Sequence, residues 1–209
     1  MSTRTFIAIE LTPGARAALA RRIEQLRRAL PQVRWVNPAS LHLTLAFLGE
    51  LDDSALAGAT GAAVLAAQEN APFELHLSGL GTFGPPAAPR VVWSGIGGDT
   101  RALQRLHDTL ARRLVERGLP ADDTHAFSPH LTLARLKQRL PARDAERLSA
   151  AIAASQTSQT AHTTPQLSLL VEHIAVMKSD LLPSGARYTC LRSCPLGTAS
   201  SGASAVSGE

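Results

Sequence analysis

The segment Ser40–Leu48, SLHLTLAFL, recurs as Ser128–Leu136, SPHLTLARL, 88 positions further along the chain. Seven of the nine positions are identical in the two copies. A repeat of this kind predicts two copies of one structural unit. The chain of 209 residues is therefore expected to form two related lobes that share one core.

Both copies have the apolar–polar alternation of a half-buried strand. Because successive side chains of a strand point to opposite faces, Leu43 is expected to face the core while His42 and Thr44 face the other way. The second copy presents His130 and Thr132 in the same manner. Two such strands related by a pseudo-two-fold axis would place the His-Thr pairs opposite each other across a cleft.

Strands and helices are interleaved along the chain without a regular βαβ rhythm. Strands are predicted at 6–11, 33–36, 41–48, 73–80, 90–96, 127–136, 167–177 and 187–196. Helices are predicted at 13–30, 53–68, 100–117 and 141–155. This order predicts a bilobal α+β fold within residues 1–196, with antiparallel sheets lining a cleft and helices on their outer faces. Residues 197–209 are of low complexity and are expected to be a disordered tail.

Composition limits the class of protein. With 44% hydrophobic residues the chain can bury a real core, which excludes wholesale disorder. A formal net charge of +4 suits an anionic ligand, although a solvated basic helix face would give the same total. No apolar run approaches the roughly 20 residues of a membrane span, and the N-terminal stretch is too short for a signal sequence. A cytoplasmic protein without membrane association is expected.

The two cysteines favour the same location. Cys190 and Cys194 are four positions apart in a predicted strand, which would separate their Cα atoms by roughly 13 Å. A disulfide needs about 7 Å or less. Both thiols are expected to be reduced, and no metal ligands are spaced near them.

Two facing histidines suit phosphodiester cleavage. One neutral imidazole can deprotonate water while one imidazolium protonates the leaving oxygen, because the histidine pKa lies near 6.5. Thr44 and Thr132 can donate hydrogen bonds to phosphate oxygens, and Arg135 can bind the same charge. This scheme needs no metal or cofactor, and by itself it leaves open whether His42 or His130 is the acid. A single His-Leu-Thr-Leu is usually an ordinary strand, but its duplication with both polar pairs intact favours a catalytic site.

The chain resembles the two-histidine (2H) phosphoesterases, and specifically the LigT-like RNA 2′,3′-cyclic phosphodiesterases, also called 2′-5′ RNA ligases. The segments that carry the resemblance span nearly the whole chain: RTFIA at 4–8, RWV at 34–36, LHLTLAFLGE at 41–50, GLGTFG at 79–84, PRVVW at 89–93, FSPHLTLAR at 127–135, and Ser179, Gly185 and Tyr188.

The resemblance implies hydrolysis of a terminal 2′,3′-cyclic phosphate to a 2′-phosphomonoester, with weak 2′-5′ ligation as the reverse reaction. It implies that His42 is the proton donor to the 3′-oxygen and that His130 is the acceptor that activates water. The implied partners are RNA or nucleotides with cyclic phosphate ends, tRNA fragments among them, bound by a monomer. A nucleotide-binding module and a phosphodiesterase for other cyclic or 2′-5′ nucleotides are the alternatives.

Further side chains are weaker candidates for lining the substrate. Phe47, Phe127 and Tyr188 are the three that we single out, since aromatic rings can stack on a nucleobase. Trp35 and Phe83 could stack on a base in the same way, although a core position is the more usual one for each of Phe47, Phe127, Trp35 and Phe83. Ser179 and Arg34 could also line the cleft, with packing or solvent exposure as the alternative. The remaining histidines lack repeated context and are expected to be structural or exposed: His76, His107, His125, His162 and His173.

Overall fold

The computed structural model describes residues 2–85, 88–120, 126–183 except 161–167, and 185–197, and it leaves the side chains of residues 157–160 undescribed. The expected tail therefore lies outside the described residues from position 198 onward, as do His125 and His162. None of the helices within the described part is long and apolar enough to cross a lipid bilayer.

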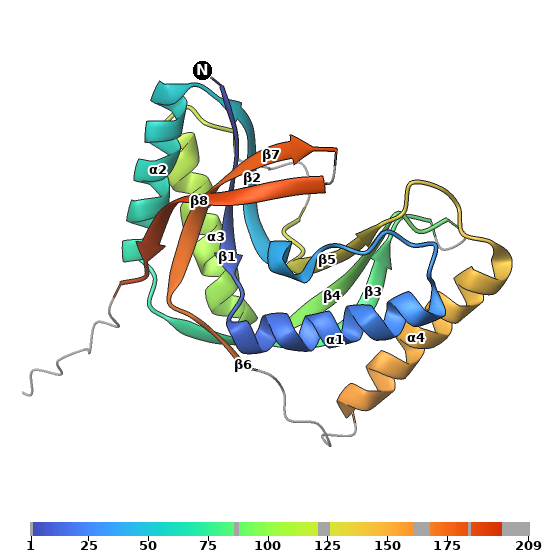
Figure 1. Ribbon diagram of the computed structural model, residues 1–209. Coiled ribbons are helices and arrows are strands. Elements are labelled where there is room, and N and C mark those ends of the chain that lie inside the picture. The colour runs from blue at the N-terminus through green and yellow to red at the C-terminus, as the bar shows by residue number, and fades with distance from the viewer. Residues whose placement is uncertain (1, 86–87, 121–125, 161–167, 184, 198–209) are drawn as a thin grey trace, which may run out of the picture.

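The described strands form two four-stranded antiparallel sheets. The first sheet has the order β2-β1-β7-β8, with the bounds His42–Leu51, Thr3–Glu10, His173–Leu182 and Gly185–Pro195. The second has the order β5-β4-β3-β6, with the bounds His130–Arg135, Val91–Gly98, Phe73–Phe83 and Ser168–Val171. The two sheets form two lobes, and helices lie on their outer faces (Figure 1). This confirms the predicted α+β class.

The helices begin where the sequence supplies caps. They are α1 (Pro13–Ala29), α2 (Asp53–Gln68), α3 (Thr100–Val115) and α4 (Ala142–Thr160), and a 3₁₀ turn, η1 (Pro38–Ser40), precedes β2. The side chains of Thr12, Asp52 and Asp99 each accept a hydrogen bond from the backbone N–H three residues on, which satisfies one of the free donors of the first turn. Pro13 begins α1 at a position that needs no N–H donor.

The duplicated units exchange their last strands. The first unit runs β1-α1-β2-α2-β3 and the second runs β4-α3-β5-α4, with β7 as its closing strand. β3 pairs with β4 of the second unit, and β7 pairs with β1 of the first. Each sheet therefore contains strands from both halves of the sequence, which joins the lobes into one folding unit.

Helices cover the outer face of each sheet. α2 and α3 lie side by side against the first sheet, whereas α1 and α4 lie under the second (Figure 1). Arg22 of α1 donates hydrogen bonds to the Ser78 carbonyl at 2.8 Å and to Ser94 Oγ at 3.1 Å, which fastens α1 to β3 and β4. Ser155 of α4 accepts a hydrogen bond from Leu80 N of β3 at 2.9 Å.

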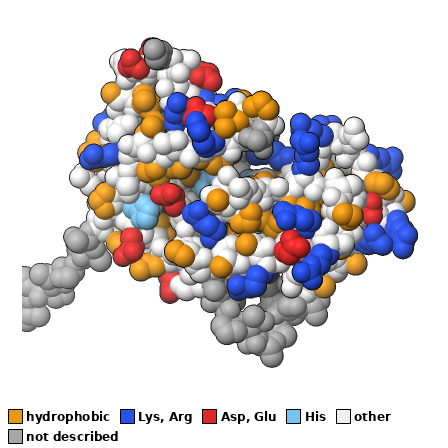
Figure 2. All heavy atoms as spheres, viewed as in Figure 1, with side chains coloured by type: hydrophobic (Ala, Val, Ile, Leu, Met, Phe, Trp, Pro, Cys, Tyr) orange, Lys and Arg blue, Asp and Glu red, His pale blue; other side chains and the backbone are white. Residues whose placement is uncertain are grey.

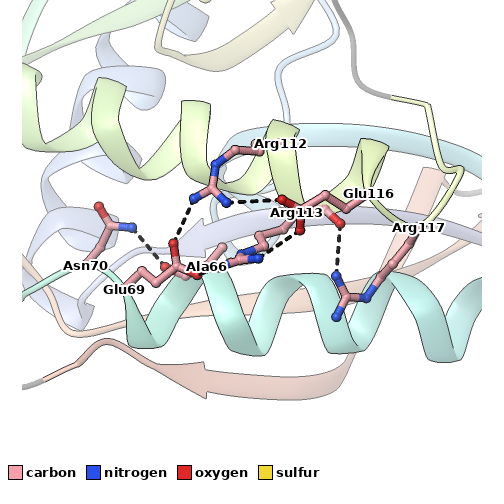
Figure 3. Close-up of polar contacts among 7 residues, drawn as sticks. All are labelled: Ala66, Glu69, Asn70, Arg112, Arg113, Glu116 and Arg117. Atoms are coloured by element: carbon pink, nitrogen blue, oxygen red, sulfur yellow. Dashed lines mark hydrogen bonds and ion pairs between the residues drawn. The ribbon is translucent and has the colours of Figure 1, made fainter.

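An ion-pair network joins the C-terminal ends of α2 and α3 (Figure 3). Glu69 accepts from Arg112 at 2.8 Å and from Arg113 Nε at 2.7 Å, and Arg113 also pairs with Glu116 at 2.8 Å. Hydrogen bonds from Arg113 and Arg112 hold the pKa of Glu69 below its usual value. The network is exposed to solvent and links the two helices, α2 and α3, that cover the first sheet.

Two predicted strands were wrong. Residues 33–36 contribute only an isolated bridge between Trp35 and Ala134. Pro31 and Pro38 lie on either side of this segment and have no N–H to extend a ladder, so no longer strand forms. The predicted strand 167–177 is two strands, β6 and β7, which separate at Glu172 and enter different sheets. A continuous apolar run does not reveal such a change of sheet.

Several predicted boundaries also moved, and β1, β2, β3 and β7 each extend three to five residues beyond the predicted strand. The second motif strand begins at His130 rather than at 127, since Pro129 has no N–H for the ladder. The last helix, α4, runs to Thr160, five residues beyond its predicted end.

Candidate active site

A β-bulge interrupts both motif strands at the same position. The register of β2 against β1 skips Leu45, and the register of β5 against β4 skips Leu133. A bulge shifts the alternation of side chains beyond it. Phe47 and Arg135 therefore share the face of the histidines, and the burial pattern is the same in both strands through these positions. We call the face of each sheet that carries its motif histidine the histidine face.

Each motif histidine is oriented by the backbone of its own motif. Nδ1 of His42 lies 2.9 Å from the Ser40 carbonyl oxygen, and Nδ1 of His130 lies 2.8 Å from the Ser128 carbonyl oxygen. A carbonyl oxygen can only accept, so Nδ1 must carry the proton that is donated. In the neutral ring this leaves the lone pair on Nε2, which is then the nitrogen that can accept a proton from a ligand.

The two motif strands approach each other where the sheets meet. The segment before η1 crosses to the second copy, and Val36 N donates to the Leu133 carbonyl at 2.8 Å. The charge of Arg135, on the second strand, also acts on His42 of the first. Burial is the main cause that lowers the pKa of His42, the Ser40 carbonyl raises it, and the Arg135 guanidinium lowers it further. The two copies therefore contribute to one electrostatic environment.

An aromatic cluster flanks His42 on the histidine face of the first sheet. The His42 ring lies 4.7 Å from the Phe6 ring and 5.0 Å from the Tyr188 ring, centroid to centroid. Phe6 and Tyr188 meet edge to face at 5.0 Å. Phe47, whose ring lies 6.1 Å from Phe6, is 57% exposed and extends the cluster outward. The cluster holds His42 in place and offers one ring to solvent.

His130 has a similar aromatic support in the second sheet. The Phe83 ring meets the His130 ring edge to face at 4.8 Å and lies 5.3 Å from the Trp93 ring. Trp93 in turn covers Gly81, where any Cβ atom would overlap the indole. Thr132 lies opposite Trp93 in the register, so the second His-Thr pair borders this aromatic support.

The sequence analysis identified most of these residues. His42, Thr44, Phe47, Tyr188, His130, Thr132 and Arg135 lie on the two histidine faces. Phe127 does not join them, because its ring stacks on His107 of α3 at 4.0 Å. Phe6 was missed, since nothing in its flanking sequence distinguishes it from a core residue, and Phe83 was expected in the core although it contacts His130.

The remaining described histidines lie on other elements than the motif strands. His173 faces Glu10 at 3.7 Å, and His76 lies over Gly97. Cys190 and Cys194 are free thiols, as predicted. Within the part of the chain that the structure describes, there is no group of three or more His, Cys, Asp or Glu side chains placed to hold a metal ion.

A duplicated strand motif, each copy presenting one histidine and one threonine on the same face of its sheet, is typical of the two-histidine phosphoesterase class. The chain belongs to the 2′-5′ RNA ligase superfamily, whose family model matches residues 15–181. The fold and the comparisons together make it a LigT-like member of that class.

Named relatives agree with this assignment. A Methanothermobacter thermautotrophicus protein named RNA 2′,3′-cyclic phosphodiesterase is 30% identical over 90% of this chain and 96% of its own length. A Geobacillus stearothermophilus protein of the same name is 38% identical over 62% of this chain, which spans 41% of that relative.

Solved structures show the same architecture. A Thermus thermophilus protein matches with a TM-score of 0.74 and 29% identity, covering 94% of this chain and 99% of the other. Apo LigT of E. coli matches with a TM-score of 0.68 and 25% identity, covering 95% and 99%. LigT has also been solved in complex with 3′-AMP.

Proposed function

We propose that this protein is an RNA 2′,3′-cyclic phosphodiesterase in which His42 and His130 are the acid–base pair. The observation that carries the proposal is the matched orientation of the two rings, each with Nδ1 on the backbone carbonyl two residues before it, which leaves Nε2 as the nitrogen for proton transfer. The names of the full-length relatives support the reaction. RNA with a 2′,3′-cyclic phosphate end is the substrate, and tRNA fragments are one source of such ends.

Hydrolysis proceeds by attack of water on phosphorus. His130 takes a proton from the water as its oxygen bonds to phosphorus, and His42 gives a proton to the 3′-oxygen as the P–O3′ bond breaks. The products are a 2′-phosphomonoester and a free 3′-hydroxyl. The reverse of the same steps would give weak 2′-5′ ligation. The pseudo-symmetric site would allow either order of the histidines, and this order follows the resemblance to the family.

The remaining polar groups act on the phosphate. Thr44 and Thr132 donate hydrogen bonds to its non-bridging oxygens, and Arg135 stabilises the charge that these oxygens gain in the transition state. In the free protein the lowered pKa of His42, caused mainly by burial, disfavours the imidazolium that a proton donor needs. A bound phosphate neutralises the field of Arg135 and favours the imidazolium, so His42 gains its proton together with the substrate.

The proposal extends to the cellular setting. Two free thiols suit a reducing compartment, which supports a cytoplasmic protein. Pairing across both lobes completes the described sheets within one chain, which supports a monomer.

The test is hydrolysis of an RNA oligonucleotide that ends in a 2′,3′-cyclic phosphate, in the presence of EDTA. Wild type is expected to release a 2′-phosphate product, and His42→Ala and His130→Ala are each expected to lose at least about a hundredfold in kcat. His107→Gln, which replaces a histidine of helix α3, is the control and should retain activity. Binding without turnover by wild type would show a binding module instead, and activity that depends on added metal would overturn the metal-independent mechanism.

A further inference from the structure

We infer that the RNA chain leading to the cyclic phosphate runs across a basic surface of the second lobe, by which we mean the half of the molecule built on the sheet β5-β4-β3-β6. This inference rests on the proposed function and adds to it the path of the substrate's phosphates. We define the basic surface by six exposed cationic side chains: Arg34, Arg90, Arg135, Lys137, Arg139 and Arg143.

Backbone contacts bring these residues together from four segments of the chain. Leu136 N donates to the Arg90 carbonyl at 2.8 Å, so the start of β4 and the end of β5 are adjacent. The bridge from Trp35 to Ala134 places Arg34 next to Arg135. The first turn of α4 approaches the same region, where the Asp144 carboxylate accepts a hydrogen bond from Gln32. One continuous surface therefore extends from Arg135, at the histidine face, to the start of α4.

The described carboxylates around this surface form no ion pair with its six cations, and the exposed Glu146 lies three residues after Arg143 on α4. Glu24 is paired with Arg27 and Arg28, and Asp144 is paired with Arg147. Among the described residues, none of the six side chains of the basic surface forms an ion pair. The space-filling view shows Lys and Arg gathered over the right-hand half of the molecule, where α1 and α4 lie (Figure 2).

The first lobe carries the opposite charge at the equivalent place. After its copy of the motif, the chain continues with Glu50, Asp52 and Asp53, whereas the second copy continues with Lys137 and Arg139. β2 continues as a strand to Leu51 whereas β5 ends at Arg135, and the charge of the chain that follows each motif differs in sign. A polyanion would be repelled by the chain that follows the first motif and attracted by the chain that follows the second.

The aromatic rings favour the same direction. Phe47 is exposed on the histidine face of the first sheet and can stack on the terminal base. With the base on the first lobe, the phosphates upstream of the terminal nucleotide extend toward the second lobe. Contacts with these phosphates would be independent of sequence and would weaken as the salt concentration rises. A cyclic mononucleotide has no upstream chain and should not sense the basic surface.

The experiment compares two matched double variants on two substrates. Arg139→Gln/Arg143→Gln removes two charges from the basic surface, and Arg101→Gln/Arg105→Gln removes two exposed charges from α3, on the first lobe. Arg143 and Arg101 are each the second residue of their helix, so both substitutions alter the same helix position. The substrates are a 2′,3′-cyclic mononucleotide and an RNA oligonucleotide with the same end.

We expect the first variant to lower kcat/KM for the oligonucleotide only. Loss of two phosphate contacts reduces the slope of log kcat/KM against log salt concentration by about 1.4. The ratio of kcat/KM of wild type to that of the variant, on the oligonucleotide, should therefore fall about sevenfold between roughly 50 and 200 mM salt. The α3 variant should match wild type on both substrates. Equal losses on mononucleotide and oligonucleotide, or an unchanged salt slope, would overturn the inference. If wild type turns over neither the mononucleotide nor the oligonucleotide, the proposed function itself is rejected.

Discussion

Leu45 and Leu133 are the unpaired residues of the same β-bulge, formed once in each copy of the motif. Within the nine-residue repeat, only two positions differ, and one of these is the pair Phe47 and Arg135 just beyond the bulge. The bulge brings this pair onto the histidine faces. The duplication thus provides the same His-Thr chemistry twice, while the position after the bulge supplies an exposed ring in one lobe and a cation in the other.

If Phe47 stacks on the terminal base, Phe47→Ala should raise KM with little change in kcat. Stacking of one base on an aromatic side chain is worth roughly 1–3 kcal/mol, so KM for a cyclic mononucleotide should rise about five- to hundredfold. Leu181→Ala is a suitable control, because this side chain is 68% exposed near the end of β7. Steady-state kinetics with ribose 2′,3′-cyclic phosphate, which lacks a base, should show no effect of Phe47→Ala. A loss on that substrate too would place the ring in catalysis or folding.

Replacement of Arg135 should change the titration of His42. The positive guanidinium disfavours the imidazolium of His42, so Arg135→Gln should raise the pKa of His42 in the free protein. Burial continues to lower that pKa, since the variant leaves the aromatic cluster intact. NMR titration of the histidine Cε1–H signals, assigned with His42→Ala, measures the shift. Arg139→Gln, on the basic surface beyond the end of β5, is the comparison, and an equal shift there would show that only overall charge matters.

The sequence predicted the strand placement of the motif residues better than the topology around them. His42 and His130 were identified because the repeat preserves chemistry at a spacing of two residues, a period that fits a strand. Helix starts at Thr12, Asp52 and Asp99 were also recognised, because capping is local. The exchange of β3 and β7 between units could not be predicted, since apolar alternation does not record which strand lies alongside.

The β-bulge in the motif strands could not be predicted either, because it depends on the register of the partner strand. Strict alternation over LHLTLAFL would place Ala46 on the histidine face and Phe47 in the core. An extra residue in one strand is visible only against the register of its partner. The role of Phe6 beside His42 was missed in the same way, because the two residues are far apart in sequence and meet only through the pairing of β1 with β2.

Gly81 should be essential for the position of His130, although it does not contact the histidine. A Cβ atom at this position would overlap the Trp93 indole, which contacts Phe83, and Phe83 meets the His130 ring. Gly81→Ala should therefore destabilise the fold by roughly 1–3 kcal/mol, measured by urea unfolding, through overpacking of this surface. Gly14→Ala is the control, because no atom lies near a Cβ added there and alanine favours a helix.

The same substitution separates positioning from stability. At a temperature where Gly81→Ala remains folded, displacement of the indole should pass through Phe83 to the imidazole and lower kcat, with KM for a cyclic mononucleotide less affected. Trp35 lies on the crossing segment before η1, so a change in Trp fluorescence measured in a Trp35→Phe background reports on Trp93 alone. If the fluorescence changes while kcat is maintained, the aromatic support under His130 serves packing only, and the imidazole is held by the Ser128 carbonyl without it.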